Sequence, residues 1–295
     1  MKTVLFNVSL FGALIFSSCQ KPDLNPNGAT FSDKGCLICN DYVVGESFEI
    51  NGVSYLVVDK QMTKDAINGV NTTNPSTGLA WVQEDLTKFC TSKVTNMEEL
   101  FYEKPFNLNI SSWDVSNVTN MEFMFRATTN FNQNIGNWDV SSVTNMGGMF
   151  SGAQKFNQNL NDWDVSNVAN MASMFSGSGF NGNISSWDVN NVGSMLYMFS
   201  GCSFNGDIGS WDVGNVTDIQ GMFEANSLFN QDIGSWDVSN VLPFGFDRMF
   251  IYASTFNQDL SKWCVSQVPF LFRNDYFAEF SGLDSANYPV WGTCP

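Results

Sequence analysis

The sequence predicts an α/β repeat protein in which short strand-plus-helix units stack into a solenoid. The first observation is a spacing of 24 to 27 residues between tryptophans, each of which begins the same short sequence motif. The second is a change of pattern inside each unit, from alternation to helical spacing. Units of this kind cannot bury an apolar face alone, so they must stack. The seven tryptophans are Trp113, Trp138, Trp163, Trp187, Trp211, Trp236 and Trp263.

One unit, NIGNWDVSSVTNMGGMF at residues 134–150, shows both patterns. Trp138 and Val140 point to one face of an extended segment and Asp139 points to the other, which is the two-residue period of a strand. A Met-x-x-Met-Phe run follows with the spacing of a helical turn, and its two glycines keep that helix short. Stacking would lay strand on strand about 4.8 Å apart, with the Met-Phe stripes packed behind.

The period lies within the 20 to 29 residues of leucine-rich repeats, and I-x-x-W-x-V at residues 110–115 is a loose form of their strand motif. WDVSNVTNMEFMF at 113–125 and FNQDIGSWDVSNV at 229–241 resemble the 26-residue repeats of BspA-like bacterial surface lipoproteins. The resemblance covers roughly residues 90–295. It implies a leucine-rich-repeat-like solenoid on the cell surface and brings no catalytic residues. We predict a right-handed coil with a parallel sheet whose strands contain WDV.

The N-terminus predicts export. MKTVLFNVSLFGALIFSSC has an early lysine, a short apolar run and small residues before Cys19. This is typical of a signal peptide at 1–18 and too short for a membrane span. FSSC resembles a relaxed bacterial lipobox, so we expect Cys19 to be lipidated; the alternative is an ordinary signal peptide cleaved nearby. The polar residues that follow predict a tether over 19–35. The expected location is a lipid anchor at the bacterial cell surface, in the outer membrane if the cell is Gram-negative.

Two segments without the repeat predict caps around the solenoid, which takes 91–265 in about seven coils. In the N-terminal cap, 36–90, the alternation around Asn51-Gly52 predicts a hairpin. AWVQEDLTKFC predicts a short amphipathic helix, so this cap should be a small α+β unit. Residues 266–295 lose the period and are rich in Phe, as expected of a C-terminal cap.

Six cysteines remain after the lipidated one, and an exported protein favours disulfides. Cys264 occupies the slot that is Asp in the six earlier units, which predicts a bridge to Cys294 in the terminal segment. At the other end we favour Cys39–Cys90, with Cys36–Cys90 as the alternative. The C-x-x-C spacing lacks the further ligands of a zinc site and the βαβ context of a redox motif.

Composition narrows the function. The 29 acidic residues against 13 Lys and Arg give a formal net charge of −16, which opposes nucleic-acid binding and adsorption to anionic lipid. Histidine is absent from the sequence, which removes the usual general base, the Ser–His or Cys–His pair and most zinc or copper sites. We therefore expect no catalytic residues, no metal site and no cofactor. Carboxylate catalysis stays open in principle, but no unique acid pair stands out from the repeat.

Acids between the two inward residues of each predicted strand should form a column on the exposed face. They are the candidate ligand face, for a partner or for Ca²⁺; the alternative is a solubilising ladder bonded to neighbouring Ser hydroxyls and backbone. One carboxylate per coil is a poor cage for Ca²⁺, which takes six to eight oxygens. The acids are Asp114, Asp139, Asp164, Asp188, Asp212 and Asp237.

Two further columns are expected to be structural. The tryptophans share the Ile and Val face, so we place them in the core rather than on a carbohydrate-stacking surface. Asparagines after the strand should bond the turn backbone between coils, in a ladder that Ser142 and Gln267 interrupt. Its members are Asn117, Asn167, Asn191, Asn215 and Asn240. The asparagines of the FNQ words (Asn132, Asn157 and Asn257) are expected to do similar work at the next corner.

Together these features predict a non-enzymatic cell-surface lipoprotein whose solenoid presents an extended acidic face to a protein or glycan partner, as in adhesion. The leading alternative is a structural spacer or display scaffold without a specific ligand. An enzyme is the third possibility.

Overall fold

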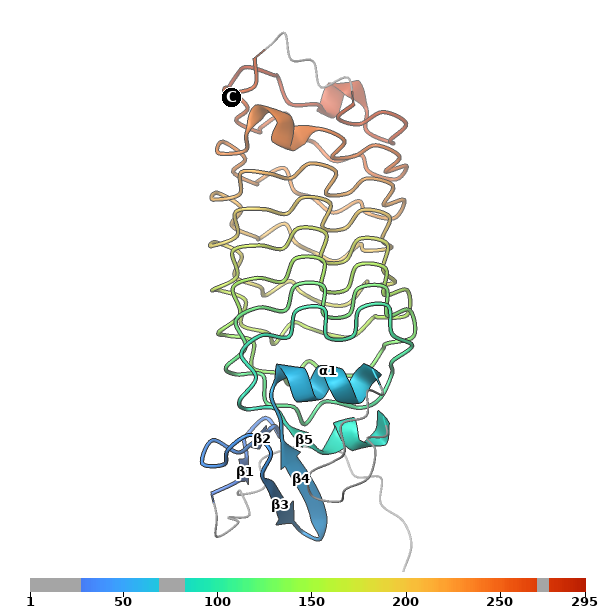
Figure 1. The fold of residues 1–295 in the computed structure, drawn as a ribbon. Helices are drawn as coiled ribbons and strands as arrows, with labels where there is room; N and C mark the ends of the chain where they lie inside the picture. The colour runs from blue at the N-terminus through green and yellow to red at the C-terminus, as the bar shows by residue number, and fades with distance from the viewer. Residues whose placement is uncertain (1–27, 69–82, 270–275) are drawn as a thin grey trace, which may run out of the picture.

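A computed structural model describes residues 28–68, 83–269 and 276–295. The predicted signal peptide, Cys19 and the first part of the predicted tether lie outside these residues. Figure 1 shows an elongated column of stacked coils, with a small mixed unit at the N-terminal end and the C-terminal segment across the other end.

The N-terminal unit contains two small sheets. In the first, β1 (Thr30–Phe31) pairs antiparallel with β2 (Leu37–Ile38). The second has the order β3-β4-β5. There β3 (Ser47–Ile50) lies antiparallel to β4 (Val53–Val57), and β4 runs parallel to β5 (Phe89–Cys90). The parallel pair joins the cap to the chain that enters the first coil.

The hairpin predicted at Asn51-Gly52 is confirmed. Asn51 has a φ of 51° and Gly52 a φ of 78°, the two positive values that a type I′ turn requires between antiparallel strands. Glycine adopts this conformation without a steric penalty, and asparagine tolerates it better than most residues.

The helices of the cap differ from the prediction. The structure contains α1 (Lys60–Asn68), which we did not predict, and Asp59 caps it by accepting the Met62 N–H at 2.8 Å. Figure 1 places α1 across the end of the stack. The amphipathic segment expected to form a helix up to Cys90 instead forms the 3₁₀ helix η1 (Gln83–Lys88) followed by β5. The last two residues of the segment pair with β4, so the helix ends at Lys88.

Each coil is built from turns that alternate with bonds to the next coil. In the second coil, Met124 N–H bonds the Met121 carbonyl at 3.1 Å and closes a turn. The N–H groups at every second residue point to the next coil instead; they belong to Met121, Phe123, Phe125 and Ala127. Phe123 and Ala127 both have a φ of 55°. These left-handed residues aim successive N–H groups at the neighbouring coil.

Two predicted details of the coil are therefore wrong. Over residues 91–265, all of them described, the WDV segments form no strand, and the Met-x-x-Met-Phe segments form turns rather than helices. A left-handed residue at every fourth position cannot continue a right-handed helix. The expected sheet reduces to single parallel bridges in one column: Asn96, Asn120, Asn145, Asn170, Ser194 and Asp218. The handedness of the coil and its relation to leucine-rich repeats stay predictions.

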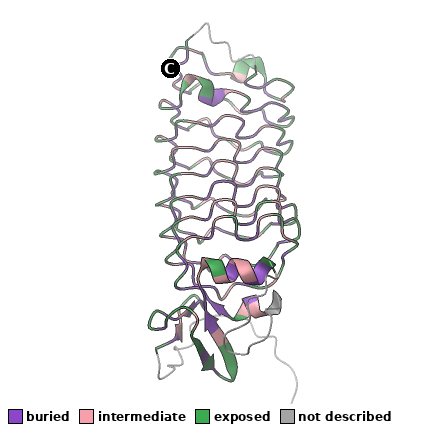
Figure 2. Ribbon diagram, in the orientation of Figure 1, coloured by how far each residue is buried: buried purple, intermediate pink, exposed green. Residues whose placement is uncertain are grey.

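The core is continuous along the column, and Figure 2 shows buried and exposed residues alternating along the coils. Two phenylalanine columns run through it. Phe150 stacks on Phe156 of its own coil at 3.9 Å and on Phe175 of the next coil at 5.7 Å, both with planes 4° apart. Such pairs contribute about 0.5–1.5 kcal/mol each beyond the burial of their surface. Stacking thus couples neighbouring coils as well as filling each one.

The predicted C-terminal cap turns out to be a further, degenerate coil. Phe250 N–H bonds the Phe277 carbonyl at 2.8 Å and Tyr252 N–H bonds the Glu279 carbonyl at 3.0 Å. The same chain then passes the 3₁₀ helix η3 (Ser285–Asn287). It follows the register of the coil beneath although the WDV words have disappeared from its sequence.

Disulfides join Cys39 to Cys90 and Cys264 to Cys294, which are the two pairs that we favoured. The first links the segment after β2 to β5, and the second links the seventh coil to the end of the chain. Cys36, the alternative partner of Cys90, is a free and buried thiol.

Candidate interaction surface

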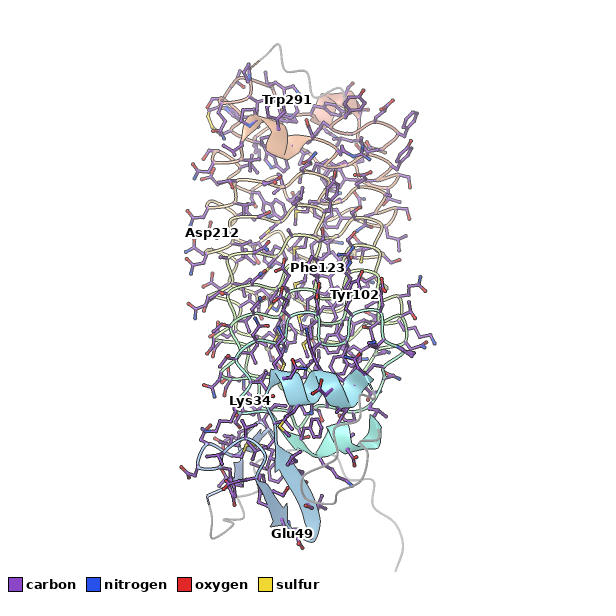
Figure 3. The ribbon with its side chains drawn as sticks, in the orientation of Figure 1. Lys34, Glu49, Tyr102, Phe123, Asp212 and Trp291 are labelled. Atoms are coloured by element: carbon purple, nitrogen blue, oxygen red, sulfur yellow. A yellow bond between two sulfur atoms is a disulfide. The ribbon has the colours of Figure 1, made fainter. Side chains whose placement is uncertain are left out.

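The aspartate column runs along one edge of the stack, where Figure 3 shows Asp212 pointing outward. Its last four members are exposed: Asp164, Asp188, Asp212 and Asp237. Asp139 is half-buried, and Asp114 is only 4% exposed. The candidate ligand face is thus open over four coils and covered at its first one.

Each exposed carboxylate also closes a turn of its own backbone. Oδ1 of Asp164 accepts the Ser166 N–H at 3.1 Å and the Ser166 hydroxyl at 2.6 Å. The hydroxyl, and then the N–H, lower the pKa of Asp164, and Ser239 does the same to the pKa of Asp237. Oδ1 of Asp188, Asp212 and Asp237 accepts the N–H two residues later in the same way. These bonds are the ones expected if the column is a solubilising ladder bonded to neighbouring Ser hydroxyls and backbone.

Asp114 is buried because the N-terminal unit folds over it. Its Oδ2 accepts the Ser92 hydroxyl at 2.6 Å, and its Oδ1 accepts the Ser116 hydroxyl at 2.7 Å. The satisfied carboxylate ties the first turn of the column to the segment after β5. This residue is therefore unavailable as part of an exposed face.

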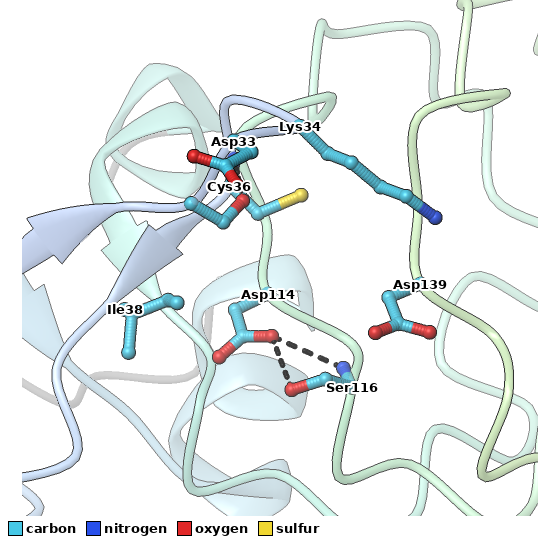
Figure 4. Close-up of a pocket in the computed structure, with 8 residues that line it drawn as sticks. Asp33, Lys34, Cys36, Ile38, Asp114, Ser116 and Asp139 are labelled. Atoms are coloured by element: carbon cyan, nitrogen blue, oxygen red, sulfur yellow. Dashed lines mark hydrogen bonds between the residues drawn. The ribbon is translucent and has the colours of Figure 1, made fainter. Parts of the chain in front are cut away.

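A cavity of about 290 Å³ lies beside Asp114, where the β1–β2 hairpin meets the stack. Figure 4 shows Lys34 reaching over it toward Asp139, with the Cys36 thiol between the hairpin and the coils. Burial raises the pKa of Cys36 to about 11. A thiol that is protonated at neutral pH is a poor nucleophile. The cavity therefore does not have the electrostatics of a thiol-based active site.

The seven tryptophans of the repeat lie in the core, each at most 4% exposed. Each indole N–H also donates to a backbone carbonyl. The acceptor lies in η1 for Trp113 and in the preceding coil for the other six; for Trp163 it is Ile135 at 3.0 Å. The sequence reasoning placed the rings correctly and missed this bond. The signal was present, because every unit uses Trp and none substitutes another apolar ring. The acceptors are Leu86, Ile110, Ile135, Leu160, Ile184, Ile208 and Ile233.

The asparagine column bonds the backbone of the preceding coil. Its amide groups donate to the carbonyls of Ser92, Ser141, Ser166, Asn190 and Gly214. The expectation that Gln267 interrupts this ladder is wrong. The longer Gln267 side chain donates to the Ser239 carbonyl and continues the ladder into the seventh coil.

A second amide ladder runs along the next corner. Asn132 Oδ1 accepts the Asn157 N–H at 3.0 Å, and the pattern repeats from coil to coil until Asn257 Oδ1 accepts the Asp284 N–H at 2.9 Å. The terminal coil thus joins the ladder through Asp284. Side-chain amides fix the register on two corners of the stack.

Among the residues described, no helix is long and apolar enough to cross a membrane. Over the same residues, no group of three or more Cys, Asp and Glu side chains is placed to hold a metal ion.

Two overlapping stretches, residues 71–182 and 176–285, each match the family model described as "Mycoplasma protein of unknown function, DUF285". Comparison with curated proteins and comparison with solved structures gave no match. The two tandem matches agree with the repeat in the sequence and with the stacked coils. Since they cover most of the 295 residues, the chain belongs to the DUF285 family.

Proposed function

We propose that this protein is a non-enzymatic, lipid-anchored cell-surface protein that binds a protein or glycan partner along the outside of its stacked coils. We further propose that this member of the DUF285 family is related to the BspA-like surface lipoproteins, because its repeat motifs resemble theirs. The single observation that carries the proposal is the rigid, repetitive side of the stack, with four exposed carboxylates in register.

Rigidity supports this function because a preorganised surface loses little conformational entropy on binding. In each central coil, four backbone N–H groups bond to the next coil, and one backbone N–H and one indole N–H bond to the preceding coil. The formal net charge of −16 makes nucleic acid and other polyanions poor partners.

A structural spacer is the second candidate, and one observation favours it. The carboxylate oxygens of the aspartate column accept hydrogen bonds from their own turns, so a folding role explains why the column repeats. A spacer would hold other molecules away from the membrane without recognising a ligand.

Binding is tested by applying the purified, lipid-free protein to a glycan array and to immobilised extracellular proteins. The interaction proposal expects saturable binding that weakens when Asp188 and Asp212 are both changed to Asn. No binding on either platform would favour the spacer. If the double substitution leaves binding unchanged, the partner binds elsewhere on the protein and not at the acidic face.

Anchoring is tested separately with radiolabelled palmitate in a bacterial host. The intact chain should incorporate label, and a Cys19→Ala chain should not. Label in both chains, or in neither, would contradict lipidation at Cys19 while leaving the binding proposal untouched.

A further inference from the structure

Large apolar side chains are exposed at the two ends of the column. Three of them, Val43, Val44 and Val53, lie around the β3–β4 hairpin, and seven lie at the C-terminal end. Of the residues described between positions 54 and 227, none is a large exposed hydrophobic. The seven are Leu228, Leu242, Phe244, Tyr252, Tyr276, Phe280 and Val290.

Register brings a compact group of these residues together. The bonds from Phe250 and Tyr252 to the terminal coil repeat those of the coil below and place Phe280 above Tyr252, while Tyr276 directly precedes Phe277, whose carbonyl accepts the Phe250 N–H. The Tyr252 and Phe280 rings stack at 5.2 Å with planes 7° apart. We call Arg248, Tyr252, Tyr276 and Phe280 the terminal aromatic patch.

In interior coils, the column that ends at Tyr252 and Phe280 holds only alanine and glycine: Ala127, Gly152, Gly177, Gly201 and Ala225. The column that ends at Arg248 holds small residues and also the rings of Phe123 and Tyr197. Arg248, Tyr252 and Phe280 adopt φ values of 58–61° with large side chains, although glycine is the residue that takes this conformation at least cost. Nothing in coil packing requires these side chains, since they project from the core.

The patch combines exposed aromatic side chains with an arginine whose charge is balanced by a carboxylate. Arg248 forms an ion pair with Glu224, and this carboxylate raises the pKa of the guanidinium. The side chain of Arg248 remains 46% exposed, and an exposed pair of this kind adds little to stability because water screens it. Tyr197, two coils below Arg248, also raises the pKa of the Arg248 guanidinium. The surface is thus aromatic and polar at once and has little net charge.

Its size argues against a protein partner. The three aromatic residues are 54%, 62% and 65% exposed. Since a whole aromatic side chain buries about 150–250 Å², the patch offers roughly 270–450 Å². A stable protein interface needs about 800 Å² per partner. A short sugar chain fits the smaller area and the mixed chemistry. Its C–H faces pack on aromatic rings, and its hydroxyls bond guanidinium, carboxylate and phenol groups.

We propose that the terminal aromatic patch binds a neutral oligosaccharide, with the sugar rings stacked on Tyr252, Phe280 and Tyr276 and their hydroxyls bonded to the Arg248–Glu224 pair. This proposal rests on the proposed surface-binding function, and it places the binding site at the C-terminal end of the column rather than on the aspartate column. The acidity of the chain disfavours a polyanionic sugar.

The test is isothermal titration calorimetry with cellohexaose, chitohexaose, mannohexaose and the anionic hexagalacturonate. We expect one or more neutral sugars to bind and hexagalacturonate not to bind. Tyr252→Ala/Phe280→Ala should weaken binding at least tenfold. The matched control is Leu228→Ala, which removes a 50% exposed side chain outside the patch and should bind as the unaltered protein does. If the double variant unfolds, Tyr276→Ala replaces it, with an expected loss of at least threefold.

Equal affinity in the patch and control variants would overturn the proposal, as would binding of hexagalacturonate alone. If no sugar binds but an immobilised protein does, the proposal fails and the broader surface-binding function survives. If neither sugar nor protein binds, both fail and the spacer function remains.

Discussion

At the scale of single residues, an aromatic ring at one left-handed position is matched by a glycine in the next coil. Tyr197 has a φ of 54° and Gly221, one coil later, a φ of 58°. A β-carbon on Gly221 would overlap the Tyr197 ring, and one on Gly148 would overlap the Phe123 ring. These glycines are therefore needed both for their backbone conformation and for the space that they leave to a neighbour's side chain.

Gly221→Ala should destabilise the protein by about 1–3 kcal/mol, the sum of the left-handed penalty for a β-carbon and the displacement of a ring. Urea unfolding measures the change. The control is Gly193→Ala, whose β-carbon would meet nothing closer than the Ala169 carbonyl at 3.8 Å. Equal losses in the two variants would contradict the role given to the Tyr197 ring.

Trp163 separates packing from hydrogen bonding. Trp163→Phe keeps an aromatic ring and removes the indole bond to the Ile135 carbonyl, which still accepts the Trp138 N–H at 3.1 Å. The variant therefore loses one hydrogen bond, which costs about 0.5–1.5 kcal/mol. Trp163→Ala removes the ring as well and should cost about 3–5 kcal/mol. The same denaturation experiment ranks them. A Trp163→Phe protein as stable as the original would show that the indole bond contributes nothing.

The aspartate turns predict a weak loss of stability in acid. Serine hydroxyls hold the pKa of Asp164, Asp237 and Asp259 below the usual value in the folded chain. Their contribution is thus complete above the unfolded pKa of about 3.9 and is lost as the pH falls through the lower folded values. Ser166→Ala should flatten the fall of the thermal midpoint between pH 5 and pH 2. Superimposable profiles would refute this assignment.

At the scale of elements, the Met-x-x-Met-Phe turns give the stack a direction. Their outward N–H groups all point toward the C-terminal end, so the last full coil needs acceptors beyond it. Phe277 and Glu279 supply those carbonyls to Phe250 and Tyr252. The terminal coil is therefore a structural requirement, because buried backbone donors without a partner are costly.

The Cys264–Cys294 bridge holds that coil in place. Cys264→Ser/Cys294→Ser should lose up to about 3–4 kcal/mol on the loop-entropy model, with early proteolysis in the segment after Cys264. Limited proteolysis with mass spectrometry locates the cuts. Cys202→Ala, a small change at a buried free thiol, is the control and should be cut no earlier than the original chain. First cuts in the central coils would contradict a role in capping.

At the scale of the whole molecule, the coil is an interchangeable module. Equivalent phenylalanines repeat every 5.7 Å along the core at Phe150 and Phe175, and each coil contacts its immediate neighbours. Stability in such arrays is approximately the sum of the coils and their interfaces.

Deleting residues 164–187 removes one full period and joins Trp163 to Asp188 in phase. We expect a folded protein with a smaller urea m-value, because less surface is exposed on unfolding. Deleting 164–175 removes half a period, puts polar residues at core positions and should prevent folding. Circular dichroism and urea titration distinguish the two. Equal folding of both deletions would refute the modular description.

The sequence by itself determined the features that are periodic or local. Seven copies of one sequence motif specify which side chains face inward, so the burial of the tryptophans could be predicted directly. Asn51-Gly52 specifies its hairpin through backbone sterics alone. The Cys264–Cys294 bridge followed from Cys264, which breaks the repeat. For Cys90 the sequence favoured Cys39 and left Cys36 as the alternative, and the structure chose Cys39. The position of the aspartate column was also predictable, because alternation places it opposite the core.

Tertiary structure decided where the backbone bonds go and which of these residues remain accessible. Periodicity reports burial, but WDV and Met-x-x-Met-Phe bury the same side chains whether their N–H groups bond within a strand, a helix or a turn. The stack offers carbonyls at a fixed spacing, and bonds to them offset the cost of left-handed residues that an isolated segment would avoid. The covering of Asp114 and the terminal aromatic patch depend on segments distant in sequence. Contacts between such segments exist only once the coils are stacked.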